Sequence, residues 1–96
     1  YLRWLRDHRG LDFADYDALW HWSLTDLPAF WGSVWEYFDV VAHTPHTQVL
    51  AEATMPGARW FTGATLNYAE NVLRMPGLAD DDPVVLAYGQ TRQPQR

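Results

Sequence analysis

Two groups of side chains are of the types that bind metal ions. Asp80–Asp82 is an acidic run, and His43 and His46 lie three positions apart. Three consecutive carboxylates point in different directions, whereas a calcium loop needs oxygen ligands spaced along a folded loop. Pro45 disfavours the helix that would bring the two imidazoles together, and the sequence offers no clear third ligand for zinc. We therefore expect a solvated turn at the acidic run and no metal site.

Nucleophilic catalysis has no recognisable machinery in the sequence. Ser23 and Ser33 are the only serines, and neither lies in a Gly-x-Ser-x-Gly elbow. There is no cysteine, and the seven basic residues are all arginine. A thiolate nucleophile, a Schiff-base lysine and the lysine of a Walker loop are thus excluded. The glycines are scattered and form no phosphate loop. We predict that this chain contains no catalytic residue and binds no cofactor by itself.

Size and charge restrict the remaining classes of function. Ninety-six residues make one small domain, 1–96. A net charge of −5 argues against nucleic acid, which attracts clustered lysine and arginine. No uncharged apolar run approaches the roughly 20 residues of a membrane span, and nothing resembles a signal peptide. We expect a soluble, cytoplasmic protein with no membrane partner.

The aromatic content is the unusual feature of the composition. The chain has six tryptophans, and each large aromatic side chain can bury about 150–250 Å². A domain of this size has little interior for all of them. Either they pack into one tight core, or part of the aromatic surface is left for a partner.

Helical patterns dominate the first forty residues. We predict helices over 1–9, ended by Gly10, over 13–24, and over 26–38, where Thr25 and Asp26 supply capping groups. The third carries the clearest apolar stripe, which is typical of a core face. Its members recur at helical spacing: Leu27, Phe30, Trp31, Val34, Trp35 and Phe38.

The rest of the chain is less regular. From 40 to 65 we expect loops with at most two short strands, around Val49–Ala51 and Arg59–Phe61. Asn67 and Glu70 form a capping pattern for a helix over 68–75. A wholly apolar strand is expected over 84–88, and it needs cover on both faces and a partner strand. The predicted fold is mainly α with a few short strands, ending in one β-strand.

Three stretches together resemble the N-terminal region of adenylate-forming acyl-CoA synthetases that make acetyl-CoA and acetoacetyl-CoA. They are Tyr16–Ser23 with the following Asp26 and Phe30-Trp31, then Val34–Phe38, and finally the run from Trp60 to Arg74 with Leu66-Asn67-Tyr68-Ala69-Glu70-Asn71 inside it. The tryptophan-rich first helices are more similar to the acetoacetyl-CoA branch. The likeness covers practically the whole chain but only the opening fraction of such an enzyme.

The resemblance implies a helical N-terminal segment of an acid–thiol ligase of lipid metabolism, inactive alone. ATP, Mg²⁺ and coenzyme A are implied for the full-length parent, and its adenylation domain is implied as the intramolecular partner. The alternative is a stand-alone aromatic module that binds a protein or a glycan. Structural or interface roles are expected at these positions: Trp20, Trp22, Phe30, Trp31, Trp35, Trp60, Phe61, Asn67 and Asn71.

Overall fold

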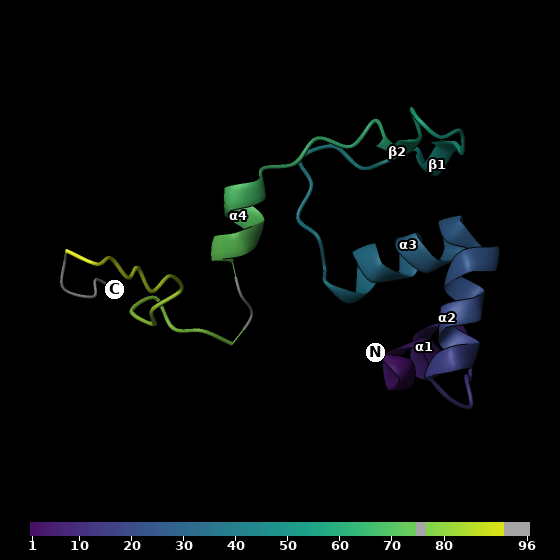
Figure 1. The fold of residues 1–96 in the computed structure, drawn as a ribbon, viewed down its shortest axis with the longest axis horizontal. Coiled ribbons are helices and arrows are strands. Elements are labelled where there is room, and N and C mark those ends of the chain that lie inside the picture. Colours follow the sequence, from purple (N-terminus) through teal and green to yellow (C-terminus); the bar gives the residue numbers. More distant parts are fainter. Residues whose placement is uncertain (75–76, 92–96) are drawn as a thin grey trace. The chain divides into compact units, whose positions relative to one another are not determined.

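The computed structural model describes residues 1–74 and 77–91, which fall into two compact units, Tyr1–Leu66 and Asn67–Arg96. The predicted class, mainly helical with few short strands, is confirmed. The first unit contains helices α1 (Leu2–Arg9), α2 (Tyr16–Thr25) and α3 (Leu27–Tyr37) and strands β1 (Gln48–Glu52) and β2 (Arg59–Thr62); the second contains helix α4 (Tyr68–Leu73) (Figure 1).

Local capping chemistry sets the boundaries of the first two helices. Gly10 ends α1 in the left-handed conformation, with φ 65°, as predicted. The helix predicted over 13–24 begins three residues later, at Tyr16. Asp15 is the reason, because its backbone is extended and its carboxylate accepts a 2.9 Å hydrogen bond from the Ala18 N–H. Phe13 therefore lies in the loop before α2.

The corner between α2 and α3 consists of one residue, Asp26. Its N–H donates to the carbonyl of Trp22 at 3.0 Å and so ends α2. Its carboxylate accepts from the Ala29 N–H at 3.1 Å and so begins α3, with Pro28 in the first turn. The capping group predicted at Asp26 is confirmed. The direction of α3 relative to α2 is thus set by the backbone of a single residue.

Helix α1 is joined to α3 by apolar and polar contacts. Leu5 is the fully buried apolar side chain of the described residues. The Ser33 hydroxyl, also buried, donates to the Phe30 carbonyl at 2.6 Å and is hydrogen-bonded to the Tyr1 hydroxyl. On the surface, the guanidinium of Arg9 approaches the Glu36 carboxylate with Nη2 2.7 Å from Oε1. The hydrogen bond and the ion pair join the two ends of α1 to α3.

The two strands form an antiparallel ribbon on the other side of α3 (Figure 1). Leu50 pairs with Trp60, and a register shift follows before Glu52. The ribbon approaches α3 closely at Gly32, where an added Cβ would lie 3.3 Å from Cγ2 of Val49. The two short strands expected around residues 49–51 and 59–61 are confirmed.

The second unit contains one short helix and turns among its described residues. Asn67 caps α4 as predicted, accepting from the Glu70 N–H at 3.1 Å, and the helix ends at Leu73. Its predicted end at Met75 lies outside the described residues. The acidic run forms the expected turn, in which the Ala79 N–H donates to the Asp82 carboxylate at 2.8 Å.

The strand expected over residues 84–88 is not formed. Only Ala87 in this run has bridge geometry, and Val84, Val85, Leu86 and Tyr88 are all exposed. A strand needs a neighbouring backbone to take its ladder of hydrogen bonds over several residues. In the described structure, β1 and β2 pair with each other. The apolar composition of residues 84–88 favours a strand, but composition alone supplies no pairing partner.

Candidate functional site

The tryptophans of the first unit belong mostly to one continuous set of ring contacts, here called the aromatic network. Trp22 of α2 contacts Phe13 at 5.2 Å between centroids and Phe30 of α3 at 5.7 Å. Phe30 contacts Trp31 at 5.3 Å, and Trp31 contacts Trp60 of β2 at 6.0 Å. The last three pairs are edge-to-face, and such pairs contribute about 0.5–1.5 kcal/mol beyond their buried area. The network therefore connects α2, α3 and the ribbon.

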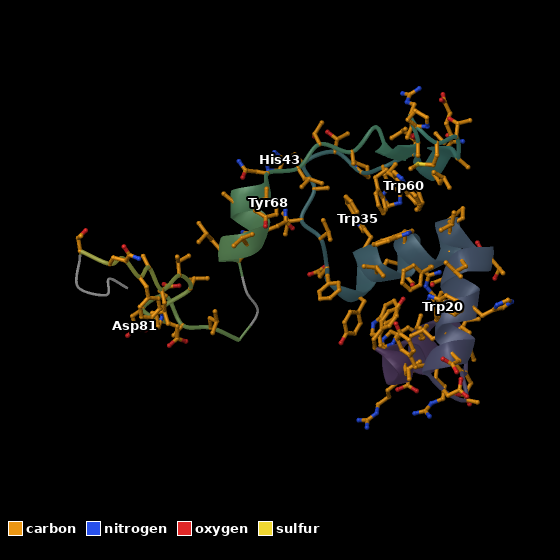
Figure 2. All side chains as sticks on the ribbon, viewed as in Figure 1. Trp20, Trp35, His43, Trp60, Tyr68 and Asp81 are labelled. Carbon is orange, nitrogen blue, oxygen red and sulfur yellow. The ribbon has the colours of Figure 1, made fainter. Side chains whose placement is uncertain are left out.

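The part of the network under the ribbon is stacked most tightly. The rings of Trp35 and Phe61 are nearly parallel, 29° apart, with centroids 4.6 Å apart. His46 packs edge-on against both, at 5.1 Å and 5.4 Å. Its Nδ1 is buried and has no hydrogen-bond partner among residues 1–74 and 77–91. Figure 2 shows Trp35 and Trp60 between α3 and the ribbon.

An apolar hollow opens beside this stack. Its volume is about 320 Å³, and it is lined by Trp31, Trp60 and Phe61. Trp31 and Trp60 remain about two-fifths exposed, at 41% and 39%. The hollow can accept apolar groups, but its three lining residues supply few hydrogen-bonding atoms to orient a polar ligand.

A second exposed surface lies on α2 and has no part in the aromatic network. Tyr16, Trp20 and Leu24 recur every four residues and are 72%, 53% and 56% exposed. Residues four apart lie on the same side of a helix. We call this row the outer face of α2. Trp20, labelled in Figure 2, is the largest side chain of this face.

Asn67 and Asn71, expected in structural or interface roles, lie in the second unit. The side chain of Asn67 caps α4, and Nδ2 of Asn71 donates to the Asn67 carbonyl at 3.0 Å. Both side chains thus support the first turn of one short helix.

The side chains weighed for catalysis have structural partners. The hydroxyls of Ser23 and Ser33 donate to the carbonyls of Trp20 and Phe30, both at 2.6 Å. Neither serine is hydrogen-bonded to a histidine in these contacts. In the part of the chain that the structure describes, no three His, Asp or Glu side chains converge as metal ligands would.

Within the same part of the chain, no helix is both long and apolar enough to cross a membrane.

Sequence reasoning missed several members of the aromatic network. Tyr1 contacts Tyr37 at 5.0 Å, and Trp4 contacts His8 at 5.1 Å in a stacked geometry. The spacing of Trp4 and His8, one helical turn, was a usable signal for that stack. The contact of Phe13 with Trp22 depends on a loop conformation that no periodic pattern encodes.

Comparison with known proteins identifies the family of this chain. Residues 16–72, more than half of the chain, match the family model described as acetyl-coenzyme A synthetase N-terminus. The chain belongs to this family. The match begins at the first residue of α2 and ends within α4, so α1 and the run 84–88 lie outside the matched range.

Relatives of this acetyl-coenzyme A synthetase N-terminus carry names of acyl-CoA ligases. The chain is 39% identical over 80 residues to an acetoacetyl-coenzyme A synthetase of Rhizobium meliloti and 35% identical over 81 residues to the malonamoyl-CoA synthetase vrtB of Penicillium aethiopicum. It covers only 12% and 11% of those proteins, with 83% and 80% of its own length aligned.

A solved structure matches nearly the whole chain. The acetoacetyl-CoA synthetase from Streptomyces lividans superposes with a TM-score of 0.83 at 45% identity, over 98% of this chain and 15% of that one. The mainly helical fold with its two-stranded ribbon is therefore that of the N-terminal segment of an acetoacetyl-CoA synthetase.

Proposed function

We propose that this chain is the N-terminal structural segment of an acetoacetate–CoA ligase, and that it acts by docking on the adenylation domain without supplying a catalytic group. The observation that carries the proposal is the match to the Streptomyces lividans enzyme: nearly all of this chain corresponds to 15% of that protein. A segment that is 45% identical to part of a much longer chain is expected to function packed against the rest of such a chain. Its partner is then the rest of the same polypeptide.

The exposed apolar surface supports a docking role. Trp20, Trp31 and Trp60 are each 39% or more exposed. Large apolar side chains that gather on a surface usually mark a contact with another body. In the full-length enzyme, the adenylation domain would cover this surface. The half-buried Trp22 and Phe30 hold the segment together instead.

The proposed reaction of the parent is the ATP-dependent conversion of a short carboxylic acid to its CoA thioester. Acetoacetate is favoured as the acid because the Rhizobium and Streptomyces relatives are acetoacetyl-CoA synthetases. ATP, Mg²⁺ and coenzyme A are assigned to the remainder of the enzyme, since this segment has no lysine and its described residues do not fit a metal. We place the parent in the cytoplasm.

A hybrid enzyme tests this function. This chain replaces the matching segment of the Streptomyces lividans enzyme, and formation of acetoacetyl-CoA from acetoacetate, ATP and coenzyme A is measured. The hybrid is expected to be active, while the same enzyme without any segment is expected to aggregate or to unfold at a lower temperature. A His43→Ala variant of the hybrid is expected to keep its turnover, because the proposal assigns the substrate site to the rest of the enzyme.

Two results would contradict the proposal. One is a segment-free enzyme as stable and active as the hybrid, because docking would then serve no purpose. The other is a selective loss of turnover, without loss of stability, on changing a polar residue of this chain.

A stand-alone module that binds a protein or a glycan is the second candidate. The apolar hollow at Trp31 and Trp60 is the observation that favours it. A glycan site also needs polar groups placed beside the stacking rings. A cooperative thermal transition of the isolated 96 residues, with a strong near-ultraviolet circular dichroism signal and little binding of a hydrophobic dye, would favour this candidate. Broad melting with strong dye binding would favour the ligase segment.

A further inference from the structure

We propose that the outer face of α2, formed by Tyr16, Trp20 and Leu24, is the surface on which the adenylation domain of the same polypeptide packs. This inference rests on the proposed function and specifies which side of the segment makes the contact. The aromatic network, apart from its exposed edge at Trp31 and Trp60, is then the internal core of the segment.

The outer face is a regular and well-positioned surface. Its three side chains follow one another at every fourth residue of a single helix, so they form a row along the helix axis. Both ends of α2 are fixed by hydrogen bonds, from the Ala18 N–H to Asp15 and from the Asp26 N–H to the carbonyl of Trp22. A row held on a capped helix is presented to a partner at little cost in conformational entropy.

The segment itself does not use this row for packing. Tyr16 and Trp20 take part in none of the ring contacts within residues 1–74 and 77–91, whereas Trp22 contacts two phenylalanines. More than half of each outer-face side chain is exposed. A helix that is apolar on two opposite sides is typical of one that lies between two bodies. Within this unit, only the side of α2 that carries Trp22 has a body to pack against.

The position of the row in the family match favours the adenylation domain as its occupant. The matched range, 16–72, begins with Tyr16 and includes the whole of α2. A surface that docks on a body shared by the family belongs in the shared range. A hollow of about 490 Å³ is lined by Tyr1, by residues of α1 and by Tyr37, and α1 lies outside that range.

Charge favours the adenylation domain over a second copy of this chain. Asp12, Asp15 and Asp17 are exposed around the beginning of the row, and the chain carries a net charge of −5. Two copies meeting through this face would bring like charges together, which opposes association. The matching surface is expected to be apolar at its centre with arginine or lysine at its edge. Buried Trp20 would also require an acceptor for its indole N–H.

Thiol labelling in the hybrid enzyme tests the location of the contact. The chain has no cysteine, so Leu24→Cys introduces one reporter, and Arg6→Cys introduces another on α1, where the side chain is 54% exposed. Mass spectrometry of the labelled peptides follows each site separately. Leu24→Cys is expected to react on the order of tenfold more slowly in the hybrid than in the isolated chain, because the contact must open first. Arg6→Cys is expected to react equally fast in both.

A second variant tests the same face without a label. Trp20→Glu places a charge in the middle of the row. It is expected to lower the melting temperature of the hybrid and to leave the circular dichroism spectrum of the isolated chain in the helical region unchanged. Met55→Glu, at an 87% exposed position between the strands, is the matched control and is expected to change neither.

The outcomes separate the inference from the proposed function. Suppose that the hybrid is active and depends on the segment, but that Leu24→Cys reacts as fast in the hybrid as in the isolated chain and Trp20→Glu does not lower the melting temperature. The docking face then lies elsewhere, and the inference is overturned. If Trp20→Glu instead converts a dimer of the isolated chain to a monomer while the hybrid is unaffected, a second copy covers this face. If the segment-free enzyme is fully stable and active, the proposed function fails first.

Discussion

The ring of Phe61 stacks on Trp35 with centroids 4.6 Å apart, while the backbone of Phe61 is left-handed, with φ 45°. This conformation costs a non-glycine residue about 1–2 kcal/mol. Gly63, two residues on, is also left-handed, with φ 87°. The stack against Trp35 and the pairing of β2 with β1 hold Phe61 in a backbone state that its own side chain opposes.

Replacing Phe61 should therefore give an unusual order of stabilities. Both Phe61→Ala and Phe61→Gly lose the stack, but only glycine relieves the backbone strain. We expect the free energy of unfolding to be about 1 kcal/mol higher for Phe61→Gly than for Phe61→Ala. Urea unfolding of the hybrid enzyme, followed by near-ultraviolet circular dichroism, measures the difference. An alanine variant at least as stable as the glycine variant would rule out a left-handed Phe61.

The hydrogen bond between the Tyr1 and Ser33 hydroxyls predicts coupling between α1 and α3. Tyr1→Phe and Ser33→Ala should each lower the free energy of unfolding by about 0.5–1.5 kcal/mol. Because they remove the same bond, the double variant should lose less than the sum. Tyr16→Phe is the matched control, since Tyr16 is 72% exposed and its hydroxyl loss should have no effect. Additive losses in the double variant would argue that the two hydroxyls act independently.

The close approach of α3 to the ribbon makes Gly32 sensitive to size. A leucine there would collide with Val49, whose Cγ2 lies 3.3 Å from an added Cβ. Overpacking of this kind typically costs about 1–3 kcal/mol. We expect Gly32→Leu to lower the unfolding midpoint in urea and Val49→Ala in the same chain to recover part of the loss. Failure of Val49→Ala to recover any stability would place the collision somewhere else.

Helix α4 should depend strongly on its cap. It has only six residues, far fewer than the roughly 12–15 at which isolated helices become marginally stable. Asn67→Ala removes the acceptor for the Glu70 N–H, at a cost of about 1 kcal/mol. We expect faster hydrogen exchange at that amide and loss of helical carbon chemical shifts over 68–73. Asn67→Asp keeps an acceptor and should preserve both signals; equal loss in both variants would contradict a capping role.

Short-range chemistry explains which parts of the fold the sequence predicted. Gly10, Asp26 and Asn67 act on backbone groups within four residues, so their roles could be read locally. Asp15 has the same chemistry, but Phe13 extends the apolar pattern of α2 and so favours a start before Asp15. Local signals compete, and the geometry of the cap decides the boundary.

Local signals do not predict which side of α2 faces the core. Trp20 and Trp22 are two residues apart, about 200° around a helix, so either could have faced the core. Phe30 decides the matter by contacting Trp22, and that contact joins two helices. The same limit applies to residues 84–88, where an apolar run predicts extended backbone but the pairing depends on segments distant in sequence.

Because the corner at Asp26 is one residue long, the segment is expected to tolerate insertions poorly at that point. If Asp26 keeps its cap and one residue is inserted after it, every later position of α3 turns by about 100° around the helix axis. Phe30 would then leave Trp22, and Gly32 would no longer face Val49. Insertions in the loop between β1 and β2 displace none of these contacts. An in-frame codon added at the corner should thus damage the segment more than most single substitutions in it.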